Sequence, residues 1–64
     1  MPWNGTRFPA SMRHLDQRVR EKAIEIANAL LEEGYDEGKA IRIAIAKAKE
    51  WAAHHAAPRR AEGR

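Results

Sequence analysis

Apolar residues recur at helical spacing through the middle of the chain. Between residues 17 and 33 they gather on one side of a helix drawn at about 100° per residue. Asp16 comes directly before this stretch, and its carboxylate can accept from the free N–H groups of a first helical turn. The pattern predicts a helix over residues 17–33. Its apolar face consists of Val19, Ala23, Ile24, Ile26, Ala27, Leu30 and Leu31, and its polar face of Gln17, Arg18, Glu21, Glu25, Asn28 and Glu32.

A second helical pattern covers residues 37–55 and is rich in alanine. Alanine has the highest helix propensity, and its small side chain lets two helix backbones approach closely. Ile43 is an exception to the pattern, because it lies among the polar positions. The apolar face of this second predicted helix consists of Ala40, Ile41, Ala44, Ile45, Ala48, Trp51 and Ala52.

The helical pattern fades after His54, and Pro58 follows a few residues later. Proline inside a helix removes a hydrogen bond, so it is typical of a helix end. We therefore expect one small helical domain over residues 1–56. Residues 57–64 are predicted to be a disordered tail or a truncated linker.

Between the two predicted helices, residues 32–38 combine acidic side chains with two glycines. An EF-hand calcium site also joins two helices by an acidic loop, but it needs a longer loop with oxygen ligands at alternate positions. A tight hinge explains the residues better. Gly34 can take the left-handed conformation that ends a helix, Tyr35 can pack back on the last turn, and Asp36 can cap the next helix.

The residues before the first predicted helix contain a shorter apolar pattern. Phe8, Met12 and Leu15 share one side at helical spacing, Pro9 can begin a short helix, and Trp3 adds a further anchor. We expect an N-terminal arm, with one short helical segment, that covers the apolar seam between the helices. The predicted fold class is therefore all-α, an antiparallel helical hairpin covered by this arm.

Size and composition narrow the ways in which such a fold is stabilised. A chain of 64 residues buries only about 60% of the surface its unfolded form exposes, so a disulfide, a metal or a partner subunit usually helps. The absence of cysteine excludes disulfides and thiolate metal sites, and it fits a cytoplasmic protein. We expect neither a secretory signal nor a membrane span, because the apolar-rich segment 40–57 carries four charged residues.

The formal charge is +3, but the charges alternate in blocks along the chain. Residues 1–20 are basic, residues 21–37 carry six acids against Lys22, and residues 38–64 are basic again. A net negative block in the middle is unfavourable for a protein that follows long stretches of phosphate backbone. Binding to nucleic acid is therefore an alternative that the charge pattern allows but does not favour.

The sequence contains no recognisable set of catalytic or metal-binding residues. Of the three histidines, His54 and His55 are adjacent, so they would point about 100° apart on a helix. Thr6 and Ser11 have no evident general base as a partner, and a chain of this size has little room for a closed pocket. We therefore expect no metal, no cofactor and no enzymatic activity.

Five short segments in combination resemble a group of small uncharacterised bacterial proteins, the YdaT-like proteins. The segments are Met1-Pro2-Trp3, Pro9-Ala10-Ser11, Ala23–Asn28, Glu33-Gly34-Tyr35 and Lys49-Glu50-Trp51. A fainter similarity, through the Met-Pro start and the alanine-rich helices, is to ChaB, the cation-transport regulator. The resemblance to the YdaT-like group implies a bacterial cytoplasmic helical module without an assigned activity.

These observations support two functional hypotheses. The first is an interaction module that binds a protein partner or forms a homodimer. The second is a small nucleic-acid-associated protein that uses the basic face of the second helix and the C-terminal tail. The candidate interaction surface consists of the acids Glu21, Glu25 and Glu32 on the first helix, with Lys39, Arg42, Ile43, Lys47 and Lys49 on the second.

Overall fold

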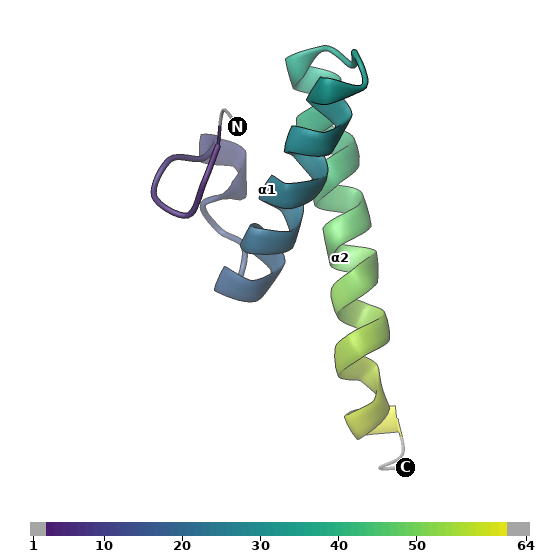
Figure 1. Cartoon of the computed structure of the whole chain (residues 1–64). Helices are drawn as coiled ribbons and strands as arrows, with labels where there is room; N and C mark the ends of the chain where they lie inside the picture. Colours follow the sequence, from purple (N-terminus) through teal and green to yellow (C-terminus); the bar gives the residue numbers. More distant parts are fainter. Residues whose placement is uncertain (1–2, 62–64) are drawn as a thin grey trace.

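The computed structural model describes the backbone of residues 3–61 and the side chains of residues 3–55. In this part of the chain it contains a short 3-10 helix, η1 (Ala10–Met12), and two α-helices, α1 (Gln17–Glu32) and α2 (Glu37–Ala61). The helices α1 and α2 run antiparallel and lie side by side, and the N-terminal arm lies beside α1 (Figure 1). The predicted all-α hairpin with an N-terminal arm is confirmed.

Local capping residues explain where α1 begins. The Asp16 side chain accepts a hydrogen bond from the Arg18 backbone N–H at 3.3 Å, and the Asp16 carbonyl accepts from the Arg20 N–H at 2.8 Å. The carboxylate thereby satisfies one of the N–H groups that lack a partner within the helix. The helix α1 begins at Gln17, as predicted, and ends at Glu32, one residue before the predicted end.

The hinge between the helices has the hydrogen bonds of a Schellman motif. The Gly34 N–H donates to the Leu31 carbonyl at 3.0 Å, and the Tyr35 N–H donates to the Leu30 carbonyl at 3.1 Å. Gly34 has a φ of 102°, the backbone conformation that the hinge interpretation requires. Asp36 then accepts from the Lys39 N–H at 3.2 Å, so its carboxylate caps α2.

The second helix is longer than the sequence pattern predicted. It continues to Ala61, so its predicted end near residue 55 was wrong, and Pro58 lies inside the helix. The alanines at residues 52, 53, 56 and 57 explain part of this continuation, because alanine favours a helix even without an apolar face. The predicted tail falls partly on residues 62–64, which lie outside the described residues.

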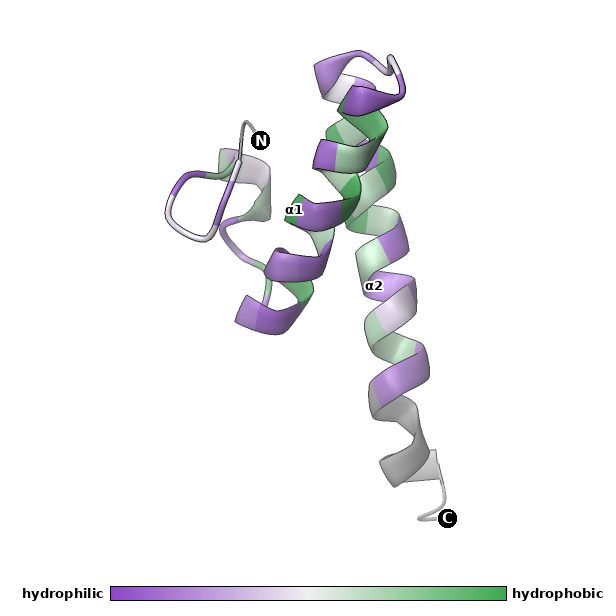
Figure 2. Cartoon of the chain, in the orientation of Figure 1, coloured by the Kyte–Doolittle hydropathy of each residue, from purple (hydrophilic) through white to green (hydrophobic). Residues whose placement is uncertain are grey.

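Alanine side chains form the contact between the two helices. Ala23 and Ala27 of α1 and Ala44 and Ala48 of α2 are fully buried. Hydrophobic positions concentrate where the helices face each other (Figure 2). Small side chains in this contact let the backbones lie close together, but they bury little apolar area per residue. Ile24 of α1 is the one large buried side chain that the described part of the two helices adds to this core.

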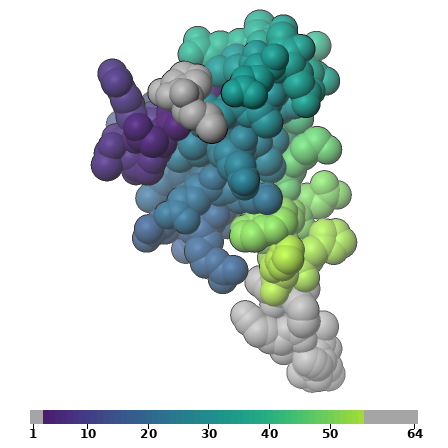
Figure 3. Space-filling model, viewed as in Figure 1, coloured from purple at the N-terminus to yellow at the C-terminus, as the bar shows by residue number. Residues whose placement is uncertain are grey.

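The arm adds further large side chains to the core. Met12 is fully buried, Leu15 is 8% exposed, and the partly buried rings of Trp3 and Phe8 pack against the same cluster. Figure 3 shows the arm packed against the side of α1. The prediction that the arm covers the apolar seam is confirmed, although Trp3 is buried only in part.

Two polar side chains of α1 attach the arm, and the sequence pattern did not identify this role. The Arg20 guanidinium donates to the Leu15 carbonyl at 3.0 Å and lies 4.7 Å from the centre of the Phe8 ring. The Asn28 side-chain amide donates to the Trp3 carbonyl at 3.1 Å. Asn28 was predicted on the polar face, but it is 5% exposed, because the arm covers this side of α1.

Candidate interaction surfaces

The charged residues of the predicted interaction surface lie on opposite sides of the hairpin. Glu25 of α1 lies two residues from the buried Ala23, and Arg42 of α2 lies two residues from the buried Ala44. Two residues correspond to about 200° around a helix, so both side chains point away from the contact between α1 and α2. The exposed acidic outer row of α1 is Glu21, Glu25 and Glu32, and the exposed basic outer row of α2 is Lys39, Arg42 and Lys49. Lys47 is also exposed, but it is four residues after Ile43 and so lies on the same side of α2 as Ile43.

The structure does not bring these two rows together within one chain. Within the described side chains, the ion pair that forms is Lys22 with Glu25, at 3.3 Å along α1. It is a partly exposed pair, so it stabilises the helix by at most a few tenths of a kcal/mol, on the order of other pairs at this spacing. The predicted contacts between the acidic and basic residues would therefore have to form between molecules.

Ile43 lies on the side of the hairpin that the arm leaves uncovered. Ile41 and Ile45 pack against the cluster that contains the arm residues, and Ile43 is two residues from each, so it points to the other side of α2. On α1, Ile26 is two residues from Asn28, the residue that binds the arm, so it points away from the arm, although it also packs against the core cluster. Both isoleucines are half-buried. We call the side that includes Ile26 and Ile43 the arm-free face.

An aromatic and cationic cluster lies at the end of the hairpin where α1 begins. The Trp51 ring has the Arg18 guanidinium 5.9 Å and the Lys22 ammonium 5.4 Å from its centre, and the His55 ring centre lies 4.8 Å away. Shallow hollows border the indole on two sides. The sequence pattern predicted Trp51 as a core residue, but it is only half-buried. We call these four residues the Trp51 cluster.

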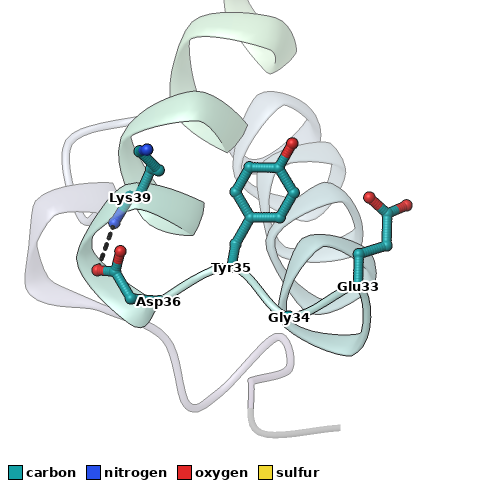
Figure 4. Close-up of a pocket in the computed structure, with 5 residues that line it drawn as sticks. All are labelled: Glu33, Gly34, Tyr35, Asp36 and Lys39. Atoms are coloured by element: carbon teal, nitrogen blue, oxygen red, sulfur yellow. Dashed lines mark hydrogen bonds between the residues drawn. The ribbon is translucent and has the colours of Figure 1, made fainter.

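The other end of the hairpin carries an acidic hollow around the hinge. It is lined by Glu33, Gly34, Tyr35, Asp36 and Lys39 (Figure 4). Tyr35 is 40% exposed, and its packing on the last turn of α1 stays a prediction. One hydrogen bond in this hollow, from the Lys39 N–H to the Asp36 carboxylate, belongs to the cap of α2.

The two hydroxyl residues that were considered for catalysis both lie in the N-terminal arm. The Thr6 hydroxyl donates to the Asn4 side chain at 3.0 Å within a local turn, and Ser11 is exposed on η1. Among the described residues, no group of three or more His, Asp or Glu side chains is arranged to bind a metal ion. In the same part of the chain, no helix is both long enough and apolar enough to cross a membrane.

Comparison with known proteins supports the resemblance found in the sequence. The chain is 60% identical over 52 residues to the uncharacterized protein YdaT of Bacillus subtilis (strain 168). The matched segment is 81% of this chain but only 35% of that relative. The predicted similarity to YdaT-like proteins is confirmed, while the similarity to ChaB stays a prediction. No family model matches the chain, and no solved structure is significantly similar to it.

Proposed function

We propose that this chain is a non-enzymatic helical module that binds protein, and that one of its partners is a second copy of itself. The observation that carries this proposal is the arm-free face. The arm covers one side of the alanine-packed hairpin, whereas Ile43 on the other side is half-buried and, unlike Ile26, Ile41 and Ile45, is not among the described residues that pack against the core cluster. Burying such side chains against a partner is favourable, at roughly 25 cal/mol per Å² of apolar surface.

The small core of a single chain supports the same proposal. The largest fully buried side chain is Met12, and most of the other fully buried residues are alanines. A core of this kind contributes little beyond the conformational entropy lost on folding. Association with a second copy would add apolar burial that one chain lacks.

The charged outer rows add a second, weaker source of affinity. Because the acidic row of α1 and the basic row of α2 point in opposite directions, they would join neighbouring molecules side by side rather than close a two-fold dimer. Exposed ion pairs contribute only about 0–1 kcal/mol each, so these rows would set orientation and salt sensitivity more than affinity. Other proteins with complementary charge are further candidates for these rows.

Sedimentation velocity and light scattering test the proposal. We expect the molecular mass of the wild-type chain to rise between micromolar and millimolar concentration, and Ile43→Glu to reduce that rise. Ala53→Glu is the matched control, since Ala53 is exposed and lies nine residues after the buried Ala44, on the opposite side of α2 from the contact with α1. A wild-type chain that stays monomeric at millimolar concentration would refute self-association.

Nucleic-acid binding is the second candidate function, and one observation favours it. The cations of the basic outer row, Lys39, Arg42 and Lys49, are all exposed along one side of α2. Fluorescence anisotropy with generic duplex DNA and RNA over a range of salt concentrations separates the two functions. Tight binding that falls steeply with salt would support this candidate, because each phosphate contact releases counterions. We expect weak binding, since the acidic row repels phosphate.

A further inference from the structure

Asn4 and Gly5 belong to an exposed loop of the arm. Two backbone hydrogen bonds between Asn4 and Arg7, at 2.8 and 3.2 Å, close this loop, and all of its residues are exposed. In Figure 1 the loop, drawn in dark purple, lies at the outer edge of the arm, away from α1. Asparagine followed by glycine is a frequent turn sequence, and it places an amide side chain next to an unobstructed backbone nitrogen.

Three donors converge on the side-chain oxygen Oδ1 of Asn4. The backbone N–H groups of Thr6 and Arg7 each donate to it at 2.9 Å, and the Thr6 hydroxyl donates to it at 3.0 Å. Because N–H groups donate to this atom, it is the oxygen and not the nitrogen of the amide. The donors draw electron density toward Oδ1, so the carbon that carries it, Cγ, is more open to attack by a nucleophile.

The backbone nitrogen of Gly5 is the nucleophile nearest to this carbon along the chain. Among the described residues, the Gly5 N–H donates to no protein acceptor. A Cβ placed on Gly5 would meet no heavy atom within 4 Å, so the space around this nitrogen is open. Once hydroxide removes its proton, the nitrogen can add to Cγ of Asn4 and close a five-membered ring.

We propose that Asn4 is a site of spontaneous deamidation, promoted by the three donors of its own loop. When the Gly5 nitrogen forms its bond to Cγ, Oδ1 takes up the negative charge, and the Thr6 and Arg7 donors stabilise it as an oxyanion hole would. The bond between Cγ and Nδ2 then breaks, and Nδ2 takes a proton from water and leaves as ammonia. The product is a succinimide ring that joins Asn4 to Gly5.

Water then opens the ring at one of its two carbonyl carbons. Addition at Cγ gives aspartate, whose carboxylate still accepts from the three donors. Addition at the backbone carbonyl carbon gives isoaspartate, in which the main chain runs through Cγ and is longer by one carbon atom. The Trp3 carbonyl, held by Asn28, anchors the arm before this point, and the Phe8 ring anchors it after this point. The isoaspartyl form should therefore hold the arm less firmly and melt at a lower temperature.

Asn28, the other asparagine of the chain, provides an internal comparison. It is buried within α1 and is followed by Ala29 instead of glycine. Its Oδ1 accepts no hydrogen bond from the described residues. Both the open nucleophile and the activating donors are therefore missing at Asn28, and its amide should remain intact while Asn4 reacts.

Incubation of the purified wild-type chain at physiological temperature and pH tests the proposal. Peptide mapping by mass spectrometry measures the loss of each amide with time, and enzymatic methylation quantifies isoaspartate. The comparison is a synthetic peptide of residues 1–8, in which the arm contacts that hold the loop are absent. We expect Asn4 to react about tenfold faster in the folded chain than in the peptide, a smaller effect than donors have in a water-excluded site. The rate should rise with pH, because the Gly5 nitrogen must lose its proton.

Two substitutions separate the roles of the donors and the nucleophile. Thr6→Val removes the hydroxyl donor but keeps the branched shape and the backbone N–H, so it should slow the reaction about threefold. Gly5→Ala places a methyl group beside the nucleophile in open space, so it should slow the reaction and leave the melting temperature nearly unchanged. Circular dichroism checks that both variants fold as the wild-type chain does.

Three results would overturn the proposal. A loss of the Asn4 amide that is no faster in the folded chain than in the peptide would mean that the hydrogen bonds protect Asn4. A Thr6→Val variant that reacts as fast as the wild-type chain would remove the donors as the cause. Equal rates at Asn4 and Asn28 would show that the loop does not matter. Self-association is independent of each result, because it concerns the other side of the hairpin.

Discussion

Replacing Gly34 by alanine tests how the hinge is built. Gly34 has a φ of 102°, a backbone conformation that residues with a Cβ atom rarely adopt. A Cβ added at this position would meet no heavy atom within 4 Å, so steric contact with neighbouring groups does not contribute. The whole effect of the substitution should therefore come from the backbone. Left-handed conformations cost other residues about 1–2 kcal/mol relative to glycine.

Gly38, the second glycine of the hinge, provides a control in which the same substitution should change stability in the opposite direction. Gly38 lies in the first turn of α2, and a Cβ there would have as its nearest contact an Asp36 carboxylate oxygen at an ordinary 3.6 Å. Alanine favours a helix more than glycine does, so Gly38→Ala should stabilise the protein by about 0.5 kcal/mol. The same chemical change should thus destabilise at one position and stabilise four residues later.

Thermal and urea unfolding followed by circular dichroism measure both effects. In a domain of this size, about 1 kcal/mol shifts the melting temperature by about 4–8 °C, so the two variants should differ clearly. The measurement is best made at micromolar concentration, where association contributes least. A neutral or stabilising Gly34→Ala would show that the Schellman motif is absent in solution, and the explanation of the hinge would be wrong.

Three further predictions concern the arm. Asn28→Ala should destabilise the fold by about 1–2 kcal/mol in urea unfolding, because it removes the donor to the Trp3 carbonyl; an unchanged midpoint would mean that this bond does not hold the arm. Met12→Ala should cost about 2–5 kcal/mol, while Met12→Leu should cost under about 1.5 kcal/mol, because Met12 is fully buried; equal melting temperatures for the two would contradict its place in the core. Deleting residues 1–8 should abolish cooperative melting and dispersed amide resonances in NMR spectra, since it removes Trp3 and Phe8 from the cluster, and retention of both would show that the hairpin folds alone.

Features that depend on neighbouring residues could be predicted from the sequence. The cap at Asp16, the left-handed Gly34 and the cap at Asp36 each involve hydrogen bonds between groups at most five residues apart. Their geometry follows from residue type, because few side chains fit those backbone conformations or accept from a free N–H group. The alanine face of α2 could be predicted for a similar reason, since helical periodicity depends only on spacing.

The tertiary structure decided which polar residues are buried and which aromatic residues remain accessible. Asn28 looks like a surface residue in a single helix, and it becomes buried only because the arm places the Trp3 carbonyl beside it. Trp51 fits the apolar pattern of α2, but it lies near the beginning of α1, where Arg18 and Lys22 meet its ring instead of a covering side chain. Periodicity describes one helix at a time, and these contacts join separate elements.

The side on which the arm lies also follows only from the fold. The sequence placed Ile43 outside the apolar pattern but did not say what it would face. In the structure the arm attaches through Arg20 and Asn28, so it covers one side of the hairpin and leaves Ile26 and Ile43 on the other. The sequence determined the helices and the hinge because those depend on local hydrogen bonds and spacing. The tertiary contacts of the arm decided which face of the hairpin the arm leaves uncovered.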